Sequence, residues 1–223
     1  MFKGFTPASI SFLKDLTLNN NKDWFEQNRP VYEKHLLEPL KLLTVELGLT
    51  IKSIDDKIDI QPQINRTISK IYRDTRFSKD KSPFRTDLWI SFKRPPKIWG
   101  NVPEFFFYFT PFDYQSGMGF YAATPENMAK FRDNILLNTD IFKKIIDKYN
   151  AQPTFLLFGE DYKKQVPNQL PTKFQVWFRK RNLYVSSIKK IDKIFFSEQL
   201  TKDIEDAFLF NADLYQFLIE SIF

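Results

Sequence analysis

The chain has 223 residues and a formal net charge of +6, with no cysteine and a single histidine. The lack of cysteine excludes disulfides, thiolate nucleophiles and Cys-ligated zinc, and His35 alone cannot supply the histidine pair of common zinc sites. No Gly/Ser/Pro-rich linker, signal-peptide pattern or membrane-length apolar run interrupts the sequence. We therefore expect one domain over residues 1–223, located in the cytoplasm, with no metal and no cofactor.

Helix signals open the chain. Thr6 followed by Pro7 predicts a helix start, because a Thr hydroxyl accepts an orphan backbone N–H and Pro needs no donor there. Asp23, with Glu26 three residues later, is typical of a capping box for a second helix. Pro30 predicts that this helix kinks or restarts at that point.

Alternating patterns in the middle of the chain predict a sheet. Residues 69–76 and 84–93 alternate in a way that indicates two half-buried strands, joined by a turn at 78–83. Residues 104–110 are apolar on both faces, which predicts a central strand covered on both sides. Residues 117–123 are its expected partner strand.

Further helices and one more strand follow. Thr124 and Pro125 predict a helix start, and a second helix is expected over 139–149. A strand is predicted over 173–184, where β-forming residues alternate with polar ones, and Ser197 is the expected cap of a final helix. The order predicts an α+β fold: a single domain with a mainly antiparallel sheet flanked by N-terminal, middle and C-terminal helices.

Positive charge is concentrated in residues 66–97. This segment holds ten cations and three carboxylates, a net charge of +7, whereas the rest of the chain sums to −1. Local charge of this kind steers an anion to one place. The cations are Arg66, Lys70, Arg73, Arg76, Lys79, Lys81, Arg85, Lys93, Arg94 and Lys97.

The basic segment has three interpretations. Its arginines can make structural ion pairs, since Arg73 and Arg76 flank Asp74. It can instead form a cleft for a small phosphate- or carboxylate-bearing ligand, helped by backbone N–H groups of the turn. The third interpretation is a nucleic-acid surface, extended by the second basic stretch at 173–193. Its aromatic platforms would be Tyr72, Phe77, Trp89 or Trp99.

Few residues suit a catalytic role. Asp74 is expected to be a poor general base, because nearby cations lower its pKa. Tyr72 and Tyr121 are candidate acids only if their pKa values are strongly depressed. The sequence therefore predicts no particular reaction.

Two motif matches fail on their context. Residues 117–122 fit the G-x-G-x-x-A dinucleotide pattern, but the predicted helix does not begin until Pro125. A Gly-bearing strand approached closely by other backbone is the better interpretation. Residues 176–181 resemble a homeodomain recognition helix, but Lys180 stands where the adenine-reading Asn would be.

Three separated blocks together resemble a known family. They are LNNNKDWFEQNRPVYE (Leu18 to Glu33), IYRDTRFSKDKSPFRTD (Ile71 to Asp87) and SGMGFYAATPENMAKFRDNI (Ser116 to Ile135). These blocks resemble the family catalogued as domain of unknown function 2461. The resemblance implies a single-domain cytoplasmic protein without an established activity, and it supplies no catalytic residues. The matched polar positions are Asn28, Arg29, Arg73, Asp74, Arg76, Ser78, Asp80 and Lys81.

The leading hypothesis is that the strand-turn-strand from Arg73 to Arg85 binds a small anionic ligand, helped by Asn28 and Arg29. The alternatives are a nucleic-acid-associated binding protein and a basic segment that is purely structural. No membrane partner is expected. The expected ligand-binding residues are Asn28, Arg29, Tyr72, Arg73, Asp74, Arg76, Ser78, Lys79, Asp80, Lys81 and Arg85.

Overall fold

A computed structural model describes residues 1–95, 102–164 and 168–222 of the chain. The helices are α1 (Pro7–Leu18), α2 (Lys22–Tyr32), the π-helix η1 (Glu33–Leu37), α3 (Glu38–Ile54), α4 (Pro125–Leu137), α5 (Thr139–Asn150), α6 (Thr172–Phe178) and α7 (Gln199–Ile222). The strands are β1 (Leu88–Phe92), β2 (Glu104–Phe109), β3 (Asp113–Phe120), β4 (Leu156–Phe158) and β5 (Leu183–Lys190).

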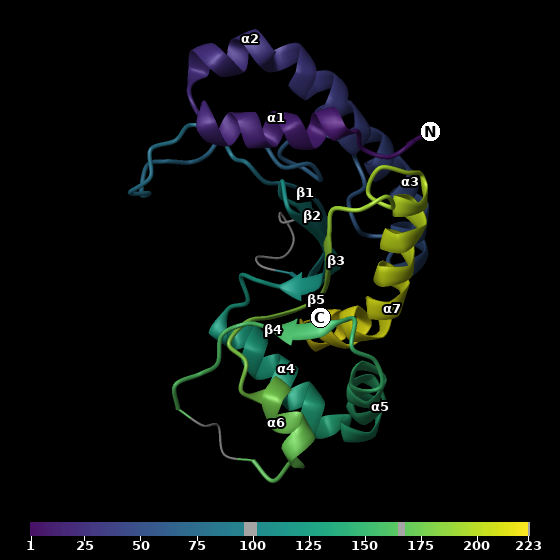
Figure 1. The fold of residues 1–223 in the computed structure, drawn as a ribbon. Coiled ribbons are helices and arrows are strands. Elements are labelled where there is room, and N and C mark those ends of the chain that lie inside the picture. The colour runs from purple at the N-terminus through teal and green to yellow at the C-terminus, as the bar shows by residue number, and fades with distance from the viewer. Residues whose placement is uncertain (96–101, 165–167, 223) are drawn as a thin grey trace.

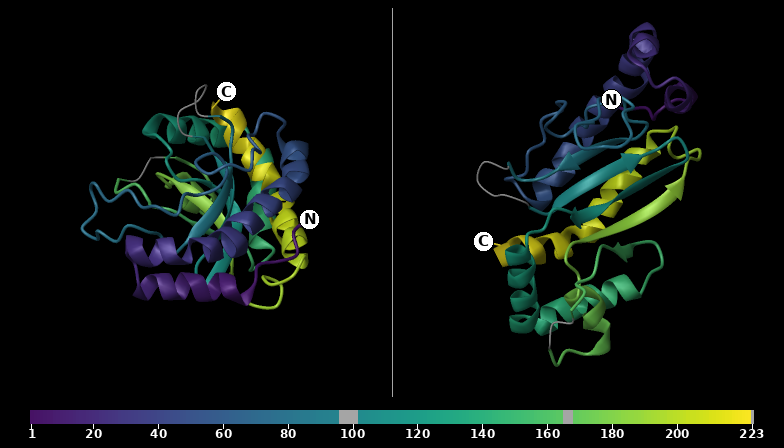
Figure 2. Two further views of the ribbon diagram at one scale, coloured as in Figure 1. Left: turned by 90° about the horizontal axis from the view of Figure 1, so that it is seen from above. Right: turned by 90° about the vertical axis from the view of Figure 1, so that its left-hand side faces the viewer.

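The five strands form one antiparallel sheet in the order β1-β2-β3-β5-β4. One face of the sheet packs on α3 and α7, and the buried apolar side chains form a single core there (Figure 1). The right-hand view of Figure 2 looks onto the opposite face, and no helix of the described chain crosses it. The predicted α+β class, with helices before, within and after an antiparallel sheet, is confirmed.

The N-terminal helices begin at polar caps. Thr6 is the N-cap residue of α1 and Pro7 is its first residue, as predicted. The predicted cap of the second helix is wrong by two residues, because Asn21 Oδ1 accepts the hydrogen bond from Trp24 N at 3.0 Å. Asp23 therefore lies in the first turn of α2, where its negative charge interacts favourably with the positive end of the helix dipole.

Two prolines are accommodated without ending the long helical path. Pro30 lies inside α2, so the helix does not restart there. The backbone widens just after it into the π-helix η1, which precedes Pro39. Pro39 has no N–H to offer the carbonyl of His35, and Ser9 Oγ on α1 donates to that oxygen instead at 2.6 Å.

The predicted strand over 69–76 is wrong. Side-chain carboxylates bend this segment: Asp74 Oδ1 accepts from Arg76 N at 3.2 Å, and Asp80 Oδ1 accepts from Ser82 N at 2.9 Å. Such Asx turns give the N–H groups of Arg76 and Ser82 local partners. Of the expected strand pair, isolated antiparallel bridges remain between Ile68 and Ile90 and between Tyr72 and Phe84. The segment is therefore an extended loop that is bridged to the residues leading into the short strand β1 and to β1 itself.

The predicted strand over 173–184 is also wrong. Its first part is the helix α6, and only the residues from Leu183 onward belong to β5. Phe174, Trp177 and Phe178 are buried, and their spacing places them on one helical face. Burial of these three rings outweighs the alternation that favoured a strand.

The remaining elements agree with the sequence. β2 pairs with β3, and Thr124 caps α4 by accepting from Asn127 N at 3.1 Å. The final helix begins at Gln199, two residues after its predicted cap Ser197, whose hydroxyl donates to Ile194 O at 3.0 Å. None of the helices in the described ranges has both the length and the apolar character to span a membrane.

Candidate functional site

The open face of the sheet carries alternate side chains of its strands. The register sets Trp89 on β1 opposite Tyr108 on β2, and Ser91 opposite Phe106. Phe106 is nevertheless buried, because aromatic rings of the same face surround it. β2 is therefore covered on both sides at Phe106, and on the outer face the cover consists of aromatic side chains.

A pocket of about 610 Å³ lies on this open face. Its size falls within the range of roughly 300 to 1,000 Å³ that small-molecule sites occupy. Among the described residues, five aromatic side chains and five charged ones line it. The aromatic residues are Trp89, Phe106, Tyr108, Tyr121 and Tyr184, and the charged residues are Arg66, Lys70, Arg85, Lys93 and Glu104.

Arg85 is a cation in the lining of the pocket that has no carboxylate partner among the described residues. Its guanidinium lies over the ring of Trp89, 4.8 Å from the ring centroid. Its Nε atom is buried without a hydrogen-bond partner, and Arg85 joins no ion pair within the described part of the chain. A buried charged donor without an acceptor costs free energy, so an anion bound here would be stabilised.

Lys70 is an exposed cation at the rim of the same pocket. Its segment is tied to the edge of β1, because Ser69 N donates to Trp89 O and Trp89 N donates to Ser69 Oγ, both at 3.0 Å. Across residues 1–95, 102–164 and 168–222, no carboxylate forms an ion pair with Lys70. Lys70 and Arg85 thus both present positive charge to one part of the pocket.

The other lining charges are compensated. Glu104 accepts a hydrogen bond from Ser91 Oγ and forms an ion pair with Lys93 Nζ at 3.0 Å. Arg66 Nη2 lies 2.7 Å from a carboxylate oxygen of Asp59. A carboxylate has about four lone-pair sites, so Glu104 can still accept a hydrogen bond from a ligand.

Two phenols of the pocket have raised pKa values. Burial, with the nearby Asp87 carboxylate, raises the pKa of Tyr108 to about 12, and the two side chains share a hydrogen bond. Burial and the adjacent Tyr184 also raise the pKa of Tyr121. The depressed pKa that an acid role for Tyr121 would require is therefore not met, and its hydroxyl can serve as a hydrogen-bond donor.

Two glycines let neighbouring groups approach the sheet closely. A Cβ on Gly117 would lie 2.0 Å from the carbonyl oxygen of Val185 on β5. A Cβ on Gly119 would lie 3.0 Å from a ring carbon of Tyr121, whose side chain rests on that glycine. The predicted Gly-bearing strand with close backbone approach is confirmed, and α4 begins only at Pro125.

Several predicted site residues pair with one another. Arg73 forms an ion pair with Asp80 and reaches Ser78 Oγ at 3.5 Å, while Arg76 pairs with Asp74 at 2.7 Å. Hydrogen bonds from Arg76 hold the pKa of Asp74 well below its usual range, which confirms the predicted direction. Arg73 turns away to Asp80 and is not the cause.

Another group of predicted residues lies on or against α2. Arg29 pairs with Glu26 at 2.6 Å and donates to Tyr72 OH at 3.3 Å. Asn28 Nδ2 donates to the Trp24 carbonyl at 2.9 Å within the same helix. These contacts fasten the loop to α2 and lie outside the lining of the pocket.

The rest of the loop divides between solvent and a smaller hollow. Lys81 Nζ donates to Thr75 O at 2.9 Å, and Lys79 is exposed. The hollow, of about 370 Å³, lies between this loop and α1. Three predicted residues line it, Arg73, Asp80 and Arg85, and of all the predicted residues Arg85 alone also lines the pocket on the sheet.

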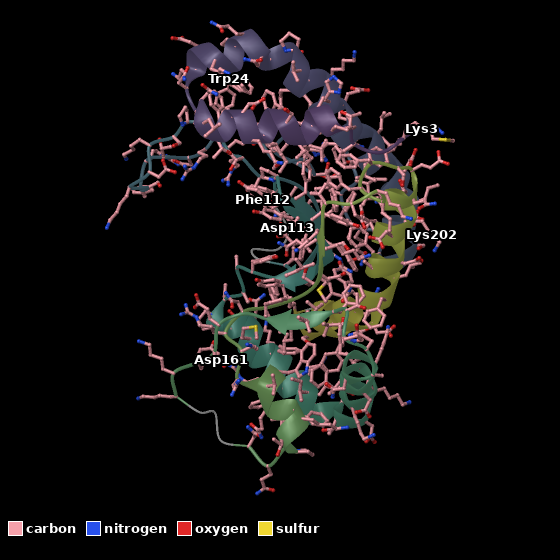
Figure 3. All side chains as sticks on the ribbon, viewed as in Figure 1. Lys3, Trp24, Phe112, Asp113, Asp161 and Lys202 are labelled. Carbon is pink, nitrogen blue, oxygen red and sulfur yellow. The ribbon has the colours of Figure 1, made fainter. Side chains whose placement is uncertain are left out.

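Cations of the second basic stretch, at 173–193, form ion pairs with carboxylates from other parts of the chain. Arg179 Nε and Lys180 Nζ each lie 2.9 Å from the carboxylate of Asp161, which Figure 3 labels on the part of the molecule formed by α4 to α6. Of the candidate stacking residues, Phe77 is 94% exposed in the loop and Trp99 lies outside the described residues.

Sequence reasoning missed most of the pocket. It counted Lys70 among the cations and Trp89 among the platforms, but it assigned no site role to Glu104, Phe106, Tyr108 or Tyr184. The signal was available in part, because residues 84–93 alternate so that Trp89 faces away from the core. Pairing residues 84–93 with 104–110 would also have placed alternate side chains of β2 on the same face as Trp89.

Within the described residues, no group of three or more His, Cys, Asp or Glu side chains is placed to hold a metal ion. Comparison with protein families gives a match over residues 8–217 to a family described as conserved hypothetical protein (DUF2461). A search of curated proteins gave no match. The family description names no activity.

Proposed function

We propose that this chain, which belongs to the DUF2461 family of conserved hypothetical proteins, binds a small organic anion in the pocket on the open face of its sheet. Arg85 is the principal contact of the anion and Lys70 adds charge at the rim. The observation that carries the proposal is the guanidinium of Arg85, which is half-buried, faces the pocket and has no acceptor for Nε among the described residues.

The surroundings of Arg85 favour an organic anion over a simple ion. Stacking on Trp89 fixes the plane of the guanidinium, and a fixed plane suits two parallel hydrogen bonds to a phosphate or carboxylate. The exposed part of the Tyr121 ring offers apolar contact in the same pocket. A ligand with an anionic group and an apolar ring satisfies both requirements.

In this proposal the remaining predicted residues are structural. The pairs Arg73 with Asp80 and Arg76 with Asp74 hold the shape of the loop, because each guanidinium already has a carboxylate. The loop in turn positions Arg85, whose backbone N–H donates to Ile71 O at 2.8 Å.

The test compares two arginines of the same basic segment. Wild type, Arg85→Gln and the matched control Arg76→Gln are screened by thermal unfolding against phosphorylated and carboxylated metabolites. A ligand at about 100 times its Kd adds roughly 2.7 kcal/mol, which is roughly 5 to 10 °C in Tm for a chain of this size. We expect Arg85→Gln to lose the shift and Arg76→Gln to keep it, because Arg76 pairs outside the pocket. A shift that survives Arg85→Gln would overturn the proposal.

A single-stranded nucleic acid is the second candidate, because the pocket combines aromatic rings with cations. The rings are partly committed to one another, however. Tyr184 stacks on Tyr121 with centroids 4.7 Å apart and on Phe158 with centroids 5.0 Å apart. A strand of several bases needs several free ring faces, so these contacts favour a small ligand with one ring. Oligonucleotide binding would show itself by a steep loss of affinity with rising salt.

A further inference from the structure

The pocket has two chemically different ends. At one end Arg85 and Lys70 present positive charge, and neither forms an ion pair with a carboxylate of the described chain. At the other end Glu104 is held by Ser91 Oγ and Lys93 Nζ, and it keeps lone pairs for another donor. A ligand that fits both ends carries its negative charge at one end and hydrogen-bond donors at the other.

The sheet sets the spacing of these ends. Arg85 lies over Trp89, whose partner on β2 is Tyr108, and Tyr108 and Glu104 lie four positions apart on that strand. At roughly 3.4 Å per residue this is about 13 Å, before the reach of the side chains is counted. An inorganic phosphate is too short to contact both ends, and a ligand with anions at both ends would face the carboxylate of Glu104.

One aromatic ring is exposed between the two ends. Phe106 lies between Glu104 and Tyr108 on the same face of β2 but is only 4% exposed, because the rings of Tyr121 and Tyr184 lie against it, with centroids 5.6 and 6.3 Å from its own. Tyr121 is 43% exposed, so its ring is the aromatic surface that this part of the pocket offers to a flat ring of a ligand.

We propose that the ligand is a mononucleotide, with its phosphate at Arg85 and Lys70, its base on the exposed part of the Tyr121 ring, and a donor of the base or sugar on Glu104. This inference rests on the proposed anion site and specifies its substrate class. A nucleotide joins a phosphate to a flat ring that carries N–H groups, which is the order of features that the pocket presents.

Calorimetric titration of the full chain tests the assignment with three kinds of probe: the four common nucleoside 5′-monophosphates, the matching nucleosides, and ribose 5-phosphate. We expect the best monophosphate to bind at least about tenfold more tightly than its nucleoside or ribose 5-phosphate, since each end supplies a charge-assisted hydrogen bond. Arg85→Gln should weaken the monophosphate and ribose 5-phosphate about tenfold, and leave the nucleoside unchanged.

The opposite end is tested by Glu104→Gln, which keeps the shape of the side chain. It should weaken the monophosphate about tenfold and leave ribose 5-phosphate unchanged. Glu26→Gln, at an exposed ion pair on α2, is the matched control and should change neither. Should Glu104→Gln fail to fold, Tyr121→Leu at the exposed wall removes the ring contact and should produce the same selective loss.

The outcomes separate the two proposals. Equal affinity for ribose 5-phosphate and the monophosphates, or no effect of the Glu104 and Tyr121 variants, overturns the nucleotide assignment. If a different anion binds in a way that depends on Arg85, the anion site stands and the nucleotide assignment falls. Binding of oligonucleotides alone, with strong salt dependence, overturns the nucleotide assignment in favour of a single-strand surface, and binding indifferent to Arg85→Gln overturns both.

Discussion

Gly119 makes room for one wall of the pocket by having no side chain. A Cβ at this position would lie 2.5 Å from Tyr184 Cβ and 3.0 Å from Tyr121 Cε2. Real Cβ atoms do not approach this closely, so the two tyrosines would have to move apart. The Tyr121 ring can therefore lie where it does on the sheet only because the residue two positions before it, Gly119, has no side chain.

Gly119→Ala is therefore expected to cost about 1 to 3 kcal/mol of unfolding free energy through overpacking, and to weaken ligand binding by displacing Tyr121. Chemical denaturation measures the first effect and titration the second. Gly48→Ala on α3 is the control, because its Cβ would meet only the mobile end of Ile60, at 3.2 Å. Ala also favours a helix interior, so this control should stay within about 1 kcal/mol of wild type. Equal costs for the two variants would refute the argument.

At the scale of elements, the hydroxyl of Ser9 supplies a hydrogen bond that the ring nitrogen of Pro39 cannot donate. Pro39 leaves the carbonyl of His35 without its helical donor, and the buried hydroxyl of Ser9 supplies it from α1 at 2.6 Å. The same Ser9 oxygen accepts from Thr6 N at 3.0 Å. This pairing ties the start of α1 to the π-helix η1.

Ser9→Ala should therefore cost about 1 to 3 kcal/mol, because it leaves the His35 carbonyl without a donor. Pro39→Ala restores an N–H next to the same carbonyl, so part of this cost should disappear in the double variant. Urea denaturation of the four proteins of this cycle gives the coupling energy. Strictly additive costs would mean that the two residues do not share the carbonyl.

The elements that the sequence predicted correctly are those with local causes. The caps of α1 and α4 are formed by Thr6 and Thr124, each followed by a proline, and no distant contact is needed to recognise them. The loop at 69–76 and the helix α6 depend on more than the local pattern. In the loop, the Asx turns at Asp74 and Asp80 leave only isolated antiparallel bridges to the segment that follows, and in α6 the burial of Phe174 and Trp177 outweighed the alternation.

The candidate site was less predictable than the fold for the same reason. Charge density identified the basic segment, and Arg85 is its member that faces the pocket. Whether a given cation is compensated depends on contacts across the fold, which composition does not reveal. Arg73 and Arg85 look alike in the sequence, yet Arg73 has Asp80 as its partner and Arg85 stacks on Trp89 without a carboxylate among the described residues.

At the scale of the whole molecule, a buried carboxylate joins three parts of the fold. Asp55, at the end of α3, has a side chain only 4% exposed. Its carboxylate accepts from Arg94 Nε just after β1 and from Tyr215 OH on α7, each at 2.6 Å, and from Lys57 N at 2.9 Å. The helical layer and the sheet are thus held together at one polar point within the core.

This junction predicts an acid sensitivity. Burial alone would raise the pKa of Asp55, but the hydrogen bonds from Arg94, Tyr215 and Lys57 outweigh it and leave the pKa below its usual value. A carboxyl whose folded pKa is depressed contributes stability that is fully present above its unfolded pKa, about 3.9, and is lost as the pH falls through the folded value. Wild type should therefore lose stability below about pH 4.

Asp55→Asn isolates this contribution from those of other carboxylates. At neutral pH it should cost about 3 kcal/mol, because it removes the negative partner of a buried ion pair. The difference in unfolding free energy between wild type and variant should be flat above about pH 5 and shrink as the pH falls below about 4, since the protonated Asp55 resembles the variant. Asp206→Asn, at an exposed pair with Lys202 on α7, is the matched control with little effect at any pH. A difference for Asp55→Asn that stays constant into acid would mean that packing, and not the charge of Asp55, joins the helices to the sheet.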